Sequence, residues 1–317
     1  MKAIVLDGYG GPNRLVLREI EPPCPSEGEV LLRVRAAGVN PVDWKIAAGD
    51  LRPFLPRRFP WIPGGDASGE VAQVGPGVTR FQEGDPVFCL NGAAGGGAYA
   101  ELLVVSESVL AHKPPSLSFE EAAALPIAGL TALQALRDHG GLSPGGTVMI
   151  HGAAGGVGHL ALQIAQALGA STGATCGPAN LEFVRGLGAD RVIDYTRDDF
   201  TRRGERYDVV FDAVGKRAYP ACRRVLEPGG VYVSTLPSMS LFFWSMATRL
   251  PHPGARHRAA FVMVKGRSAD LDDLAGLVED GKLRPRLDAV YPLERAEYAQ
   301  ERSRSGHARG KIVLSVD

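Results

Sequence analysis

The chain of 317 residues is poor in cysteine and has no long apolar segment. Four cysteines are too few for the disulfide framework of a chain this long, and their spacing rules out a Cys-x-x-Cys metal motif. No apolar run reaches about 18 residues, the length of a transmembrane helix, and the N-terminal MKAIVLDGYGG lacks the pattern of a secretory signal. We therefore expect a protein of a reducing, cytoplasmic compartment. The cysteines are Cys24, Cys89, Cys176 and Cys222.

The chain also lacks an excess of charge of either sign. It has 35 Lys and Arg residues against 35 Asp and Glu residues. It therefore has no overall field that would attract a polyanion, which argues against a dedicated nucleic-acid binder. Its hydrophobic content of 45% suits a sizeable core and argues against extensive disorder. The 40 glycines follow no collagen period, so they indicate tight turns and close backbone approach.

The first part of the chain, from Met1 to about Ser118, has the pattern of short β-strands. Apolar runs alternate with clusters of Gly, Pro and Asp, which is typical of strands joined by tight turns. Ser118 and Glu121 then have the spacing of a capping box, which predicts that a helix and a new domain begin there. The expected strands are Lys2–Leu6, Val30–Ala36, Glu70–Val74 and Ala98–Val105.

After residue 146 the pattern changes to alternating strands and helices. This alternation predicts a parallel sheet with helices on both faces, so we expect an α/β fold with a Rossmann doubly wound sheet beside a β-rich domain. Ala260–Val264 predicts a further strand, Leu271–Glu279 a helix and Lys311–Val316 a last strand. The expected strands of the parallel sheet are Thr147–His151, Ser171–Thr175, Arg191–Tyr195, Asp208–Asp212 and Val231–Leu236, and its helices are Gly156–Leu168, Asn180–Leu187 and Ala218–Leu226.

The segment VMIHGAAGGVGHLALQIAQALGA carries the clearest motif. Ala153, Gly155 and Gly158 match the dinucleotide fingerprint Gly-x-Gly-x-x-Gly with alanine in the first position, between an expected strand and an expected helix. Gly155 allows backbone N–H groups to approach a pyrophosphate, and Gly158 allows the helix to pack close to the strand. The helix N-terminus adds aligned donors and partial positive charge. We therefore predict a dinucleotide site.

The end of the following strand indicates which dinucleotide binds. An NAD site usually has Asp or Glu about 20 residues after the glycines, where it binds the ribose 2′-hydroxyl. Residues 175–180, TCGPAN, contain no carboxylate. This absence removes the repulsion against a 2′-phosphate and favours NADPH. The same residues contain no Lys or Arg, so we expect polar groups and N–H donors to hold the phosphate.

Several sequence blocks, in the same order, make the chain similar to a known family. They include AGVNPVDWK, LRPFLPRRFPWIPGGDASGEV, HGAAGGVGH and GHARGKIVL. On these blocks the chain resembles the zinc-free quinone oxidoreductase branch of the medium-chain dehydrogenase/reductase superfamily, with its NADPH-dependent ene-reductases. The resemblance implies a GroES-like substrate domain of residues 1–121, completed by residues 266–317. It also implies a Rossmann NADP(H)-binding domain of residues 122–265, with an active cleft between the domains.

Metal-using members of that superfamily carry zinc ligands at positions that hold other residues here. These positions read Asn40, Gly65 and approximately Ile127, and the four-cysteine lobe that binds a structural zinc is missing. Zinc needs several N, S or O ligands in a fixed geometry. The sequence therefore predicts no metal site and argues against a zinc-dependent alcohol dehydrogenase.

Without a metal, the substrate has to be electrophilic enough to accept hydride directly. A quinone or the C=C bond of an α,β-unsaturated carbonyl meets this condition, with NADPH as the hydride donor. The developing enolate oxygen still requires hydrogen-bond donors, and a proton has to be supplied. The resemblance implies that Asn40 and Lys45, both in the block NPVDWK, are the catalytic residues. Asp43, between them, is expected to cap the helix or to pair with Lys45.

The resemblance also assigns residues to the cofactor. Thr131 and Leu236 are expected at the nicotinamide end, and Lys311 is expected to close over the cofactor. Close relatives carry a basic residue at the position of Ala179, so this chain departs from their pattern at the phosphate site. The other expected cofactor residues are Gly155, Gly156 and Val157 at the pyrophosphate, Cys176, Gly177, Asn180 and Tyr195 at the 2′-phosphate, and Ala213 and Val214 at the adenine ribose.

Three further features leave alternatives open. His151 and His159 flank the glycine loop, and a structural role is favoured for both. Residues 238–258, in which LFFWSMATRL precedes a basic tail, indicate a substrate lid, a dimer contact or a peripheral contact with a membrane surface. Relatives pair the last Rossmann strand across a two-fold axis, so Ala260–Val264 is the expected edge of a homodimer.

A protein that binds NADPH without catalysis, as a sensor or structural component, is the rival from another functional class. The neutral charge and the NPVDWK block argue against it. The expected partner is a small electrophilic carbonyl compound or quinone.

Overall fold

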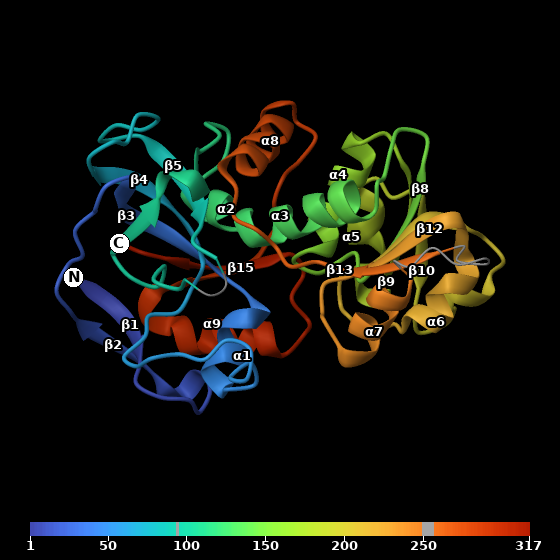
Figure 1. The fold of residues 1–317 in the computed structure, drawn as a ribbon, viewed down its shortest axis with the longest axis horizontal. Helices are drawn as coiled ribbons and strands as arrows, with labels where there is room; N and C mark the ends of the chain where they lie inside the picture. Colours follow the sequence, from blue (N-terminus) through green and yellow to red (C-terminus); the bar gives the residue numbers. More distant parts are fainter. Residues whose placement is uncertain (93–94, 249–256) are drawn as a thin grey trace. The chain divides into compact units, whose positions relative to one another are not determined.

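The structure is a computed structural model that describes residues 1–92, 95–248 and 257–317. The chain folds as two compact units (Figure 1). The first unit comprises Met1–Leu130, Lys265–Asp280 and Pro285–Asp317, and the second comprises Thr131–Val264 and Gly281–Arg284. The C-terminal segment therefore completes a unit that the N-terminal segment begins.

A seven-stranded sheet is the frame of the first unit. Its strand order is β14-β15-β3-β4-β5-β7, and β6 pairs with β3 outside this path. The long strand β3 pairs antiparallel with β4, β6 and β15, so the last strand of the chain lies beside the centre of the N-terminal sheet. The strands are β3 (Glu29–Val39), β4 (Asp66–Val74), β5 (Pro86–Leu90), β6 (Leu102–Ser106), β7 (Leu110–His112), β14 (Leu287–Pro292) and β15 (Lys311–Ser315), with β1 (Lys2–Leu6) and β2 (Leu15–Glu19) in a separate two-stranded sheet.

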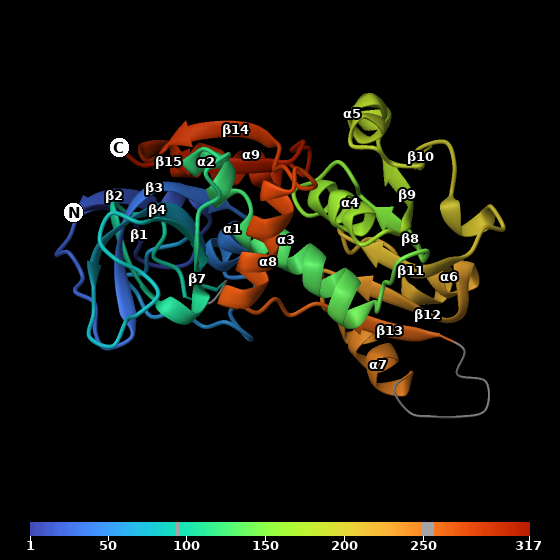
Figure 2. The ribbon, with the colours of Figure 1, turned by 90° about the horizontal axis from the view of Figure 1, so that it is seen from above.

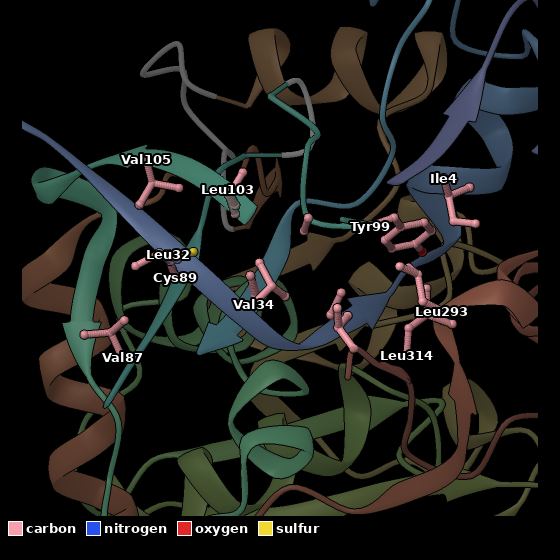
Figure 3. Close-up of a cluster of buried hydrophobic side chains, with 14 of the residues drawn as sticks. Ile4, Leu32, Val34, Val87, Cys89, Tyr99, Leu103, Val105, Leu293 and Leu314 are labelled. Atoms are coloured by element: carbon pink, nitrogen blue, oxygen red, sulfur yellow. The ribbon is translucent and has the colours of Figure 1, made fainter. Parts of the chain in front are cut away.

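Alternating apolar side chains of β3 give the first unit its core (Figure 3). Val30, Leu32 and Val34 are all buried, because every second residue of a strand points to the same face. They belong to one cluster with Tyr99 and Leu314, which come from distant parts of the chain. The helices of this unit are α1 (Pro41–Ala48), α2 (Phe119–Ala123), α8 (Ser268–Glu279) and α9 (Ala296–Arg304), and α3 (Pro126–Leu133) crosses the division at residue 130.

The second unit contains a six-stranded parallel sheet with the order β10-β9-β8-β11-β12-β13. This is the doubly wound Rossmann order, in which the direction of winding reverses at the first strand. The predicted α/β class with a parallel sheet is therefore confirmed. The elements are β8 (Thr147–His151), α4 (Gly158–Ala167), β9 (Ser171–Cys176), α5 (Leu181–Gly186), β10 (Arg191–Asp194), β11 (Tyr207–Asp212), α6 (Tyr219–Cys222), β12 (Leu226–Ser234), α7 (Met239–Ala247) and β13 (Arg258–Phe261).

Several predicted boundaries are wrong by a few residues. β4 begins at Asp66 rather than at Glu70, because the glycines and the carboxylate at its start hide the strand pattern. The expected helix Ala218–Leu226 is only the short α6 followed by a 3₁₀ turn, and β12 begins at Leu226. The sequence pattern missed this start because Glu-Pro-Gly-Gly interrupts the apolar run. β13 begins at Arg258, two residues before the expected strand Ala260–Val264.

Helix α7 lies beside β13 and exposes much of its apolar side (Figure 2). Met239, Phe242, Phe243 and Met246 are all exposed, whereas Leu241 is buried. The predicted segment 238–258 falls only in part on described residues, since 249–256 lie outside them. The substrate lid, dimer contact and membrane contact stay predictions. Within the described ranges, every helix is too short or too polar to cross a membrane.

Candidate active site

The turn after β8 has the geometry of a dinucleotide loop. Gly155, Gly156 and Val157 lie between β8 and the first turn of α4. A Cβ on Gly158 would lie 2.2 Å from the carbonyl oxygen of Gly152, so a side chain at position 158 would push the helix away from the strand. The missing side chains leave backbone N–H groups at the N-terminus of α4 accessible to a phosphate. The residues present therefore fit a pyrophosphate.

The ends of β9 and β10 bring together the residues predicted around the 2′-phosphate. Cys176 is the last residue of β9, and its carbonyl accepts a hydrogen bond from the Tyr195 N–H at 3.2 Å. The Tyr195 hydroxyl lies 3.2 Å from the position that a Cβ on Gly177 would take. Asn180 follows in a 3₁₀ turn, Pro178–Asn180. Burial raises the pKa of the Cys176 thiol to about 11, so this side chain is neutral at physiological pH.

Asp194, at the end of β10, is a carboxylate that the sequence reasoning missed. It pairs in register with Cys176, and its Oδ1 accepts hydrogen bonds from the Thr196 N–H and hydroxyl. These hydrogen bonds hold the pKa of Asp194 below its ordinary value. Sequence reasoning that considers only the end of β9 cannot find Asp194, because Asp194 comes close to Cys176 only through the pairing of β10 with β9.

The ends of β11 and β12 place three more predicted cofactor residues at the same edge of the sheet. The Ala213 N–H donates to the His151 carbonyl at 3.1 Å. Val214 donates its N–H to the buried Asp212 at 3.1 Å, and its side chain is exposed, as is that of Leu236. Because the carboxyl ends of parallel strands share one edge, the predicted residues after β8, β9, β10, β11 and β12 lie along the same edge of the sheet.

Both histidines of the loop contribute to its local structure. His151 Nδ1 lies 2.7 Å from the Thr175 hydroxyl, and burial lowers the pKa of this histidine. His159 is fully buried on α4, with Nδ1 2.9 Å from the Gly155 carbonyl oxygen. The contact of His151 with Thr175 connects β8 with β9, and the contact of His159 with Gly155 connects α4 with the glycine loop.

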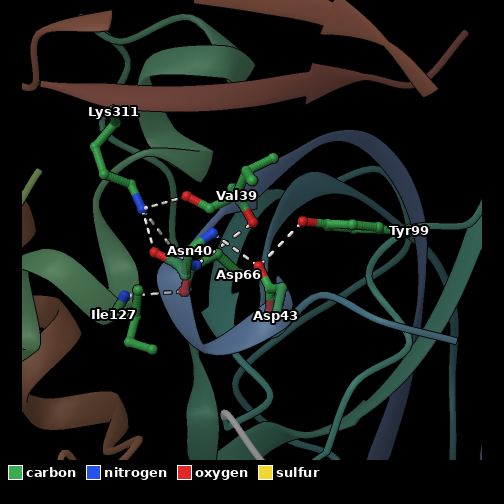
Figure 4. Close-up of polar contacts among 8 residues, drawn as sticks. Val39, Asn40, Asp43, Asp66, Tyr99, Ile127 and Lys311 are labelled. Carbon is green, nitrogen blue, oxygen red and sulfur yellow. Dashed lines mark hydrogen bonds and ion pairs between the residues drawn. The ribbon is translucent and has the colours of Figure 1, made fainter. Parts of the chain in front are cut away.

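A second group of predicted residues lies in the first unit, in a buried polar cluster (Figure 4). Lys311 Nζ donates to Asn40 Oδ1, and Asn40 Nδ2 donates to Asp66 Oδ2 at 2.9 Å. The ammonium also lies 3.6 Å from Asp66 Oδ2, and Asp66 Oδ1 accepts the Ile127 N–H at 2.9 Å. Lys311, predicted for the cofactor, is thus a direct partner of Asn40, predicted as catalytic. The polar atoms of the Asn40 amide are engaged within the protein.

Asp43 links this cluster to the start of α1. Its Oδ2 accepts the Asn40 N–H at 2.7 Å, which closes a capping box, and the Tyr99 hydroxyl at 3.0 Å. Asp43 therefore caps the helix, as predicted. The pKa of its carboxyl is raised to about 7: burial has the largest effect, the hydrogen bond from the Asn40 N–H opposes it, and the nearby charge of Asp66 adds to it.

Lys45 and Thr131 are not brought into this cluster. Lys45, on α1, has its Nζ 5.4 Å from the centre of the Trp44 ring. Burial lowers its pKa, and Asp50 opposes this effect. Thr131 is buried on α3, at the start of the second unit.

The positions that correspond to zinc ligands have other uses here. Gly65 accepts the Asn91 N–H at 2.7 Å through its carbonyl, and Ile127 contributes its N–H to Asp66. Among residues 1–92, 95–248 and 257–317, no three His, Cys, Asp or Glu side chains are arranged to hold a metal ion. Cys89, the cysteine of this unit that lies in the sheet, is buried, and burial raises its pKa to about 12.

Replacement of Asp43 by Asn is expected to stabilise the folded protein, and to do so increasingly as pH rises from about 4 to 7. A pKa raised from 3.8 to about 7 means that the folded state favours the protonated acid, so Asp43 costs stability as pH rises from about 4 to 7. The amide of Asn imitates that protonated acid. Denaturant titrations should show Asp43→Asn more stable than the parent by roughly 4 kcal/mol at pH 8 and by only about 1 kcal/mol at pH 4.5.

The exposed Asp50→Asn, on the loop after α1, is the matched change of a carboxylate to an amide. It controls for the general loss of one carboxylate from the chain. A stability difference for Asp43→Asn that does not change between pH 4.5 and 8 would contradict the assignment of a raised pKa.

Comparison with known proteins yields two family matches and many similar chains. Residues 26–115 match the alcohol dehydrogenase GroES-like domain, and residues 187–314 match the zinc-binding dehydrogenase family. The chain is 39% identical to a chloroplastic quinone-oxidoreductase of Triphysaria versicolor, over 99% of this chain and 98% of that protein. It is 36% identical to the chloroplastic NADPH-dependent alkenal/one oxidoreductase of Arabidopsis thaliana, over 99% of this chain and 79% of that protein.

A solved structure is also similar to this chain over its whole length. The quinone oxidoreductase from Coxiella burnetii superposes with a TM-score of 0.90 at 34% identity, and the match covers 100% of this chain and 99% of that one. The GroES-like match agrees with the antiparallel sheet of the first unit.

Proposed function

Since this chain belongs to the medium-chain dehydrogenase/reductase superfamily, we propose that it is a zinc-independent reductase that transfers hydride from NADPH to a quinone or to the C=C bond of an α,β-unsaturated carbonyl. The predicted superfamily and fold class are confirmed. The chain is an oxidoreductase of the quinone and enone type with a nicotinamide cofactor. The alternative of a non-catalytic NADPH-binding protein is not favoured.

The observation that carries the proposal is the turn at the carboxyl end of β8. Gly158 leaves no room for a side chain between β8 and α4, and the ends of β9 to β12 add the predicted residues along the same edge. We assign the functional domains as residues 1–121 with 266–317 for the substrate and residues 122–265 for the cofactor.

NADPH supplies a hydride when it is bound. We assign Gly155, Gly156 and Val157 to its pyrophosphate: the Gly155 N–H donates within the loop to the Gly152 carbonyl, and the N–H groups of Gly156 and Val157 lie at the N-terminus of α4, where they are suited to bind an anion. The residues at the ends of the neighbouring strands are assigned to the adenosine part, and Thr131 and Leu236 to the nicotinamide. They are Cys176, Gly177, Asn180, Tyr195, Ala213 and Val214. Lys311 is assigned to the cofactor from the first unit.

Asn40 and Lys45 are assigned to the reacting carbonyl. A quinone or enone gains negative charge on oxygen as it is reduced, and hydrogen-bond donors stabilise that charge. Burial lowers the pKa of Lys45, so this cation can donate a hydrogen bond and gives up its proton more readily than an exposed lysine. Asn40 Nδ2 donates to Asp66 at 2.9 Å and makes a long contact of 3.5 Å with the Gly38 carbonyl oxygen, so a substrate oxygen would compete with Gly38 for this second N–H.

Oxidation of NADPH by a panel of electrophiles tests the function. After treatment with EDTA, the protein should oxidise NADPH faster than NADH with quinones, cyclic and linear enones or alkenals, because these substrates accept hydride without a Lewis acid. Saturated aldehydes are the control substrates. Turnover confined to saturated aldehydes and abolished by EDTA would contradict the zinc-independent assignment, and binding of NADPH without any turnover would contradict the assignment as an enzyme.

Replacement of Lys45 by Met is expected to lower kcat with an enone by about a hundredfold, because it removes a charged donor at the developing oxyanion. KM for NADPH should change little, since the assigned contact is with the substrate. Lys45→Arg, which keeps the charge, should retain more activity. Lys2→Met, at an exposed site in β1, is the control for the loss of a lysine. An unchanged kcat in Lys45→Met would exclude Lys45 from catalysis.

Introduction of a basic residue at Ala179 is expected to strengthen the selection of NADPH. The loop after β9 lacks Lys and Arg, so an Arg there adds a charge-assisted contact with the 2′-phosphate. Ala179→Arg should lower KM for NADPH about tenfold and leave KM for NADH unchanged. Ala179→Met, of similar length without charge, should affect both cofactors alike. An equal change of both KM values in Ala179→Arg would show that the loop does not contact the 2′-phosphate.

We assign a homodimer that pairs β13 with its copy. β13 is the edge strand of the six-stranded sheet, and a free strand edge presents unpaired N–H and C=O groups. The exposed Met263 and the apolar side of α7 adjoin this edge. A cytoplasmic location stays a prediction from the separated cysteines, whereas the two curated relatives named above are chloroplastic.

A further inference from the structure

Asp66 contacts both Asn40 and Lys311, to which the proposed function assigns roles. Its Oδ2 accepts the Asn40 Nδ2 proton at 2.9 Å and lies 3.6 Å from Lys311 Nζ. Lys311 Nζ in turn donates to Asn40 Oδ1, so the three side chains form a closed ring (Figure 4). The family comparison and the sequence blocks assign no role to this carboxylate.

The carboxylate of Asp66 is itself held in place from several sides. Asp66 is the first residue of β4 and is fully buried. Its second oxygen, Oδ1, accepts the Ile127 N–H at 2.9 Å. The opposite residue on β3 is Gly38, and a Cβ there would lie 2.8 Å from Asp66 Oδ2 and 2.5 Å from the Ala123 carbonyl oxygen. Any side chain at position 38 would therefore displace the carboxylate.

The ring determines which way the Asn40 amide faces. An amide has a donor side and an acceptor side, and here the acceptor Oδ1 faces an ammonium while the donor Nδ2 faces a carboxylate. The reverse orientation would set N–H against ammonium and oxygen against carboxylate. The charges of Asp66 and Lys311 thus fix the orientation of a neutral side chain between them.

The same carboxylate balances the charge of Lys311. The ammonium is almost fully buried, and burial lowers its pKa. Its hydrogen-bond acceptors are Asn40 Oδ1 and the Val39 carbonyl at 3.4 Å, both of them neutral. The negative charges that oppose the loss of its proton are Asp66 and, with a smaller effect, Asp43. A buried cation keeps its charge only where such a partner is present.

We propose that Asp66 is a positioning residue, which holds the Lys311 ammonium charged and the Asn40 amide oriented for the bound nicotinamide cofactor and its substrate. This inference rests on the proposed function of Asn40 and Lys311. Asp66 acts through these two side chains and does not itself touch the reacting atoms.

The first test compares Asp66→Asn with the parent in steady-state kinetics from pH 6 to pH 9. The variant keeps the shape of the side chain and removes its charge. KM for NADPH should rise about tenfold at pH 7 and further toward pH 9, as Lys311 loses its proton, while kcat changes less. Glu70→Gln is the matched change on the same strand, outside the cluster. A fall in kcat that is equal at every pH, with KM unchanged, would indicate a structural role and overturn the proposal.

The second test measures the charge of Lys311 directly, without catalysis. The chain contains only seven lysines, so lysines labelled with ¹³C at Cε can be resolved by NMR, and Lys311→Arg identifies the signal of interest. The parent signal should remain that of an ammonium up to pH 9, and in Asp66→Asn its pKa should fall by more than one unit. An unchanged pKa would overturn the proposal.

These two tests separate the inference from the proposed function. If the parent does not oxidise NADPH with any substrate, the function fails while the lysine titration still decides the role of Asp66. If Asp66→Asn does not fold, the parent itself decides, since a Lys311 signal that loses its proton below pH 8 would overturn the proposal. A double variant, Asp66→Asn with Lys311→Met, should bind NADPH no more weakly than Lys311→Met alone, because Asp66 acts through the lysine. An additional loss of affinity in the double variant would contradict this.

Discussion

A cation buried in a β-sheet is the constraint around which the first unit is organised. Removal of an ammonium from water costs several kcal/mol unless an anion and hydrogen-bond acceptors replace the water. Lys311 receives these from Asp66 and Asn40. The need to fit them explains the glycine at position 38 and the orientation of Asn40.

The parallel sheet of the second unit, and the edge along which its strands end, could be predicted from the sequence because the signals are local. A strand, a glycine turn and a helix follow one another within residues 147–167, and the other residues that we assign to the cofactor in this unit, except Thr131 on α3, lie at strand ends. Parallel pairing then brings these ends together without further information. The exception, Asp194, shows the limit of this reasoning, because its closeness to Cys176 is a property of pairing between strands.

The polar cluster of the first unit could be predicted only in part. Asn40, Asp43 and Lys311 were identified, but in separate roles, since 271 residues separate Lys311 from Asn40 and no periodicity relates them. Asp66 and Tyr99 were missed. A carboxylate between glycines resembles a turn residue, and only the burial of β4 shows that Asp66 needs a partner. Lys45 is close to Asn40 in sequence but lies outside the cluster. On α1 its ammonium is 5.4 Å from the centre of the Trp44 ring.

The order in which the chain is synthesised gives the pairing of β15 with β3 a further consequence. Residues 131–264 hold almost all of the second unit in one continuous segment, so every strand of its parallel sheet is synthesised before β15. The first unit needs β15 as the partner of β3 and Lys311 for its buried cluster, so its parts are not all present until residues 311–315 have been made. The unit that begins first in the sequence is therefore the last for which all strands are available.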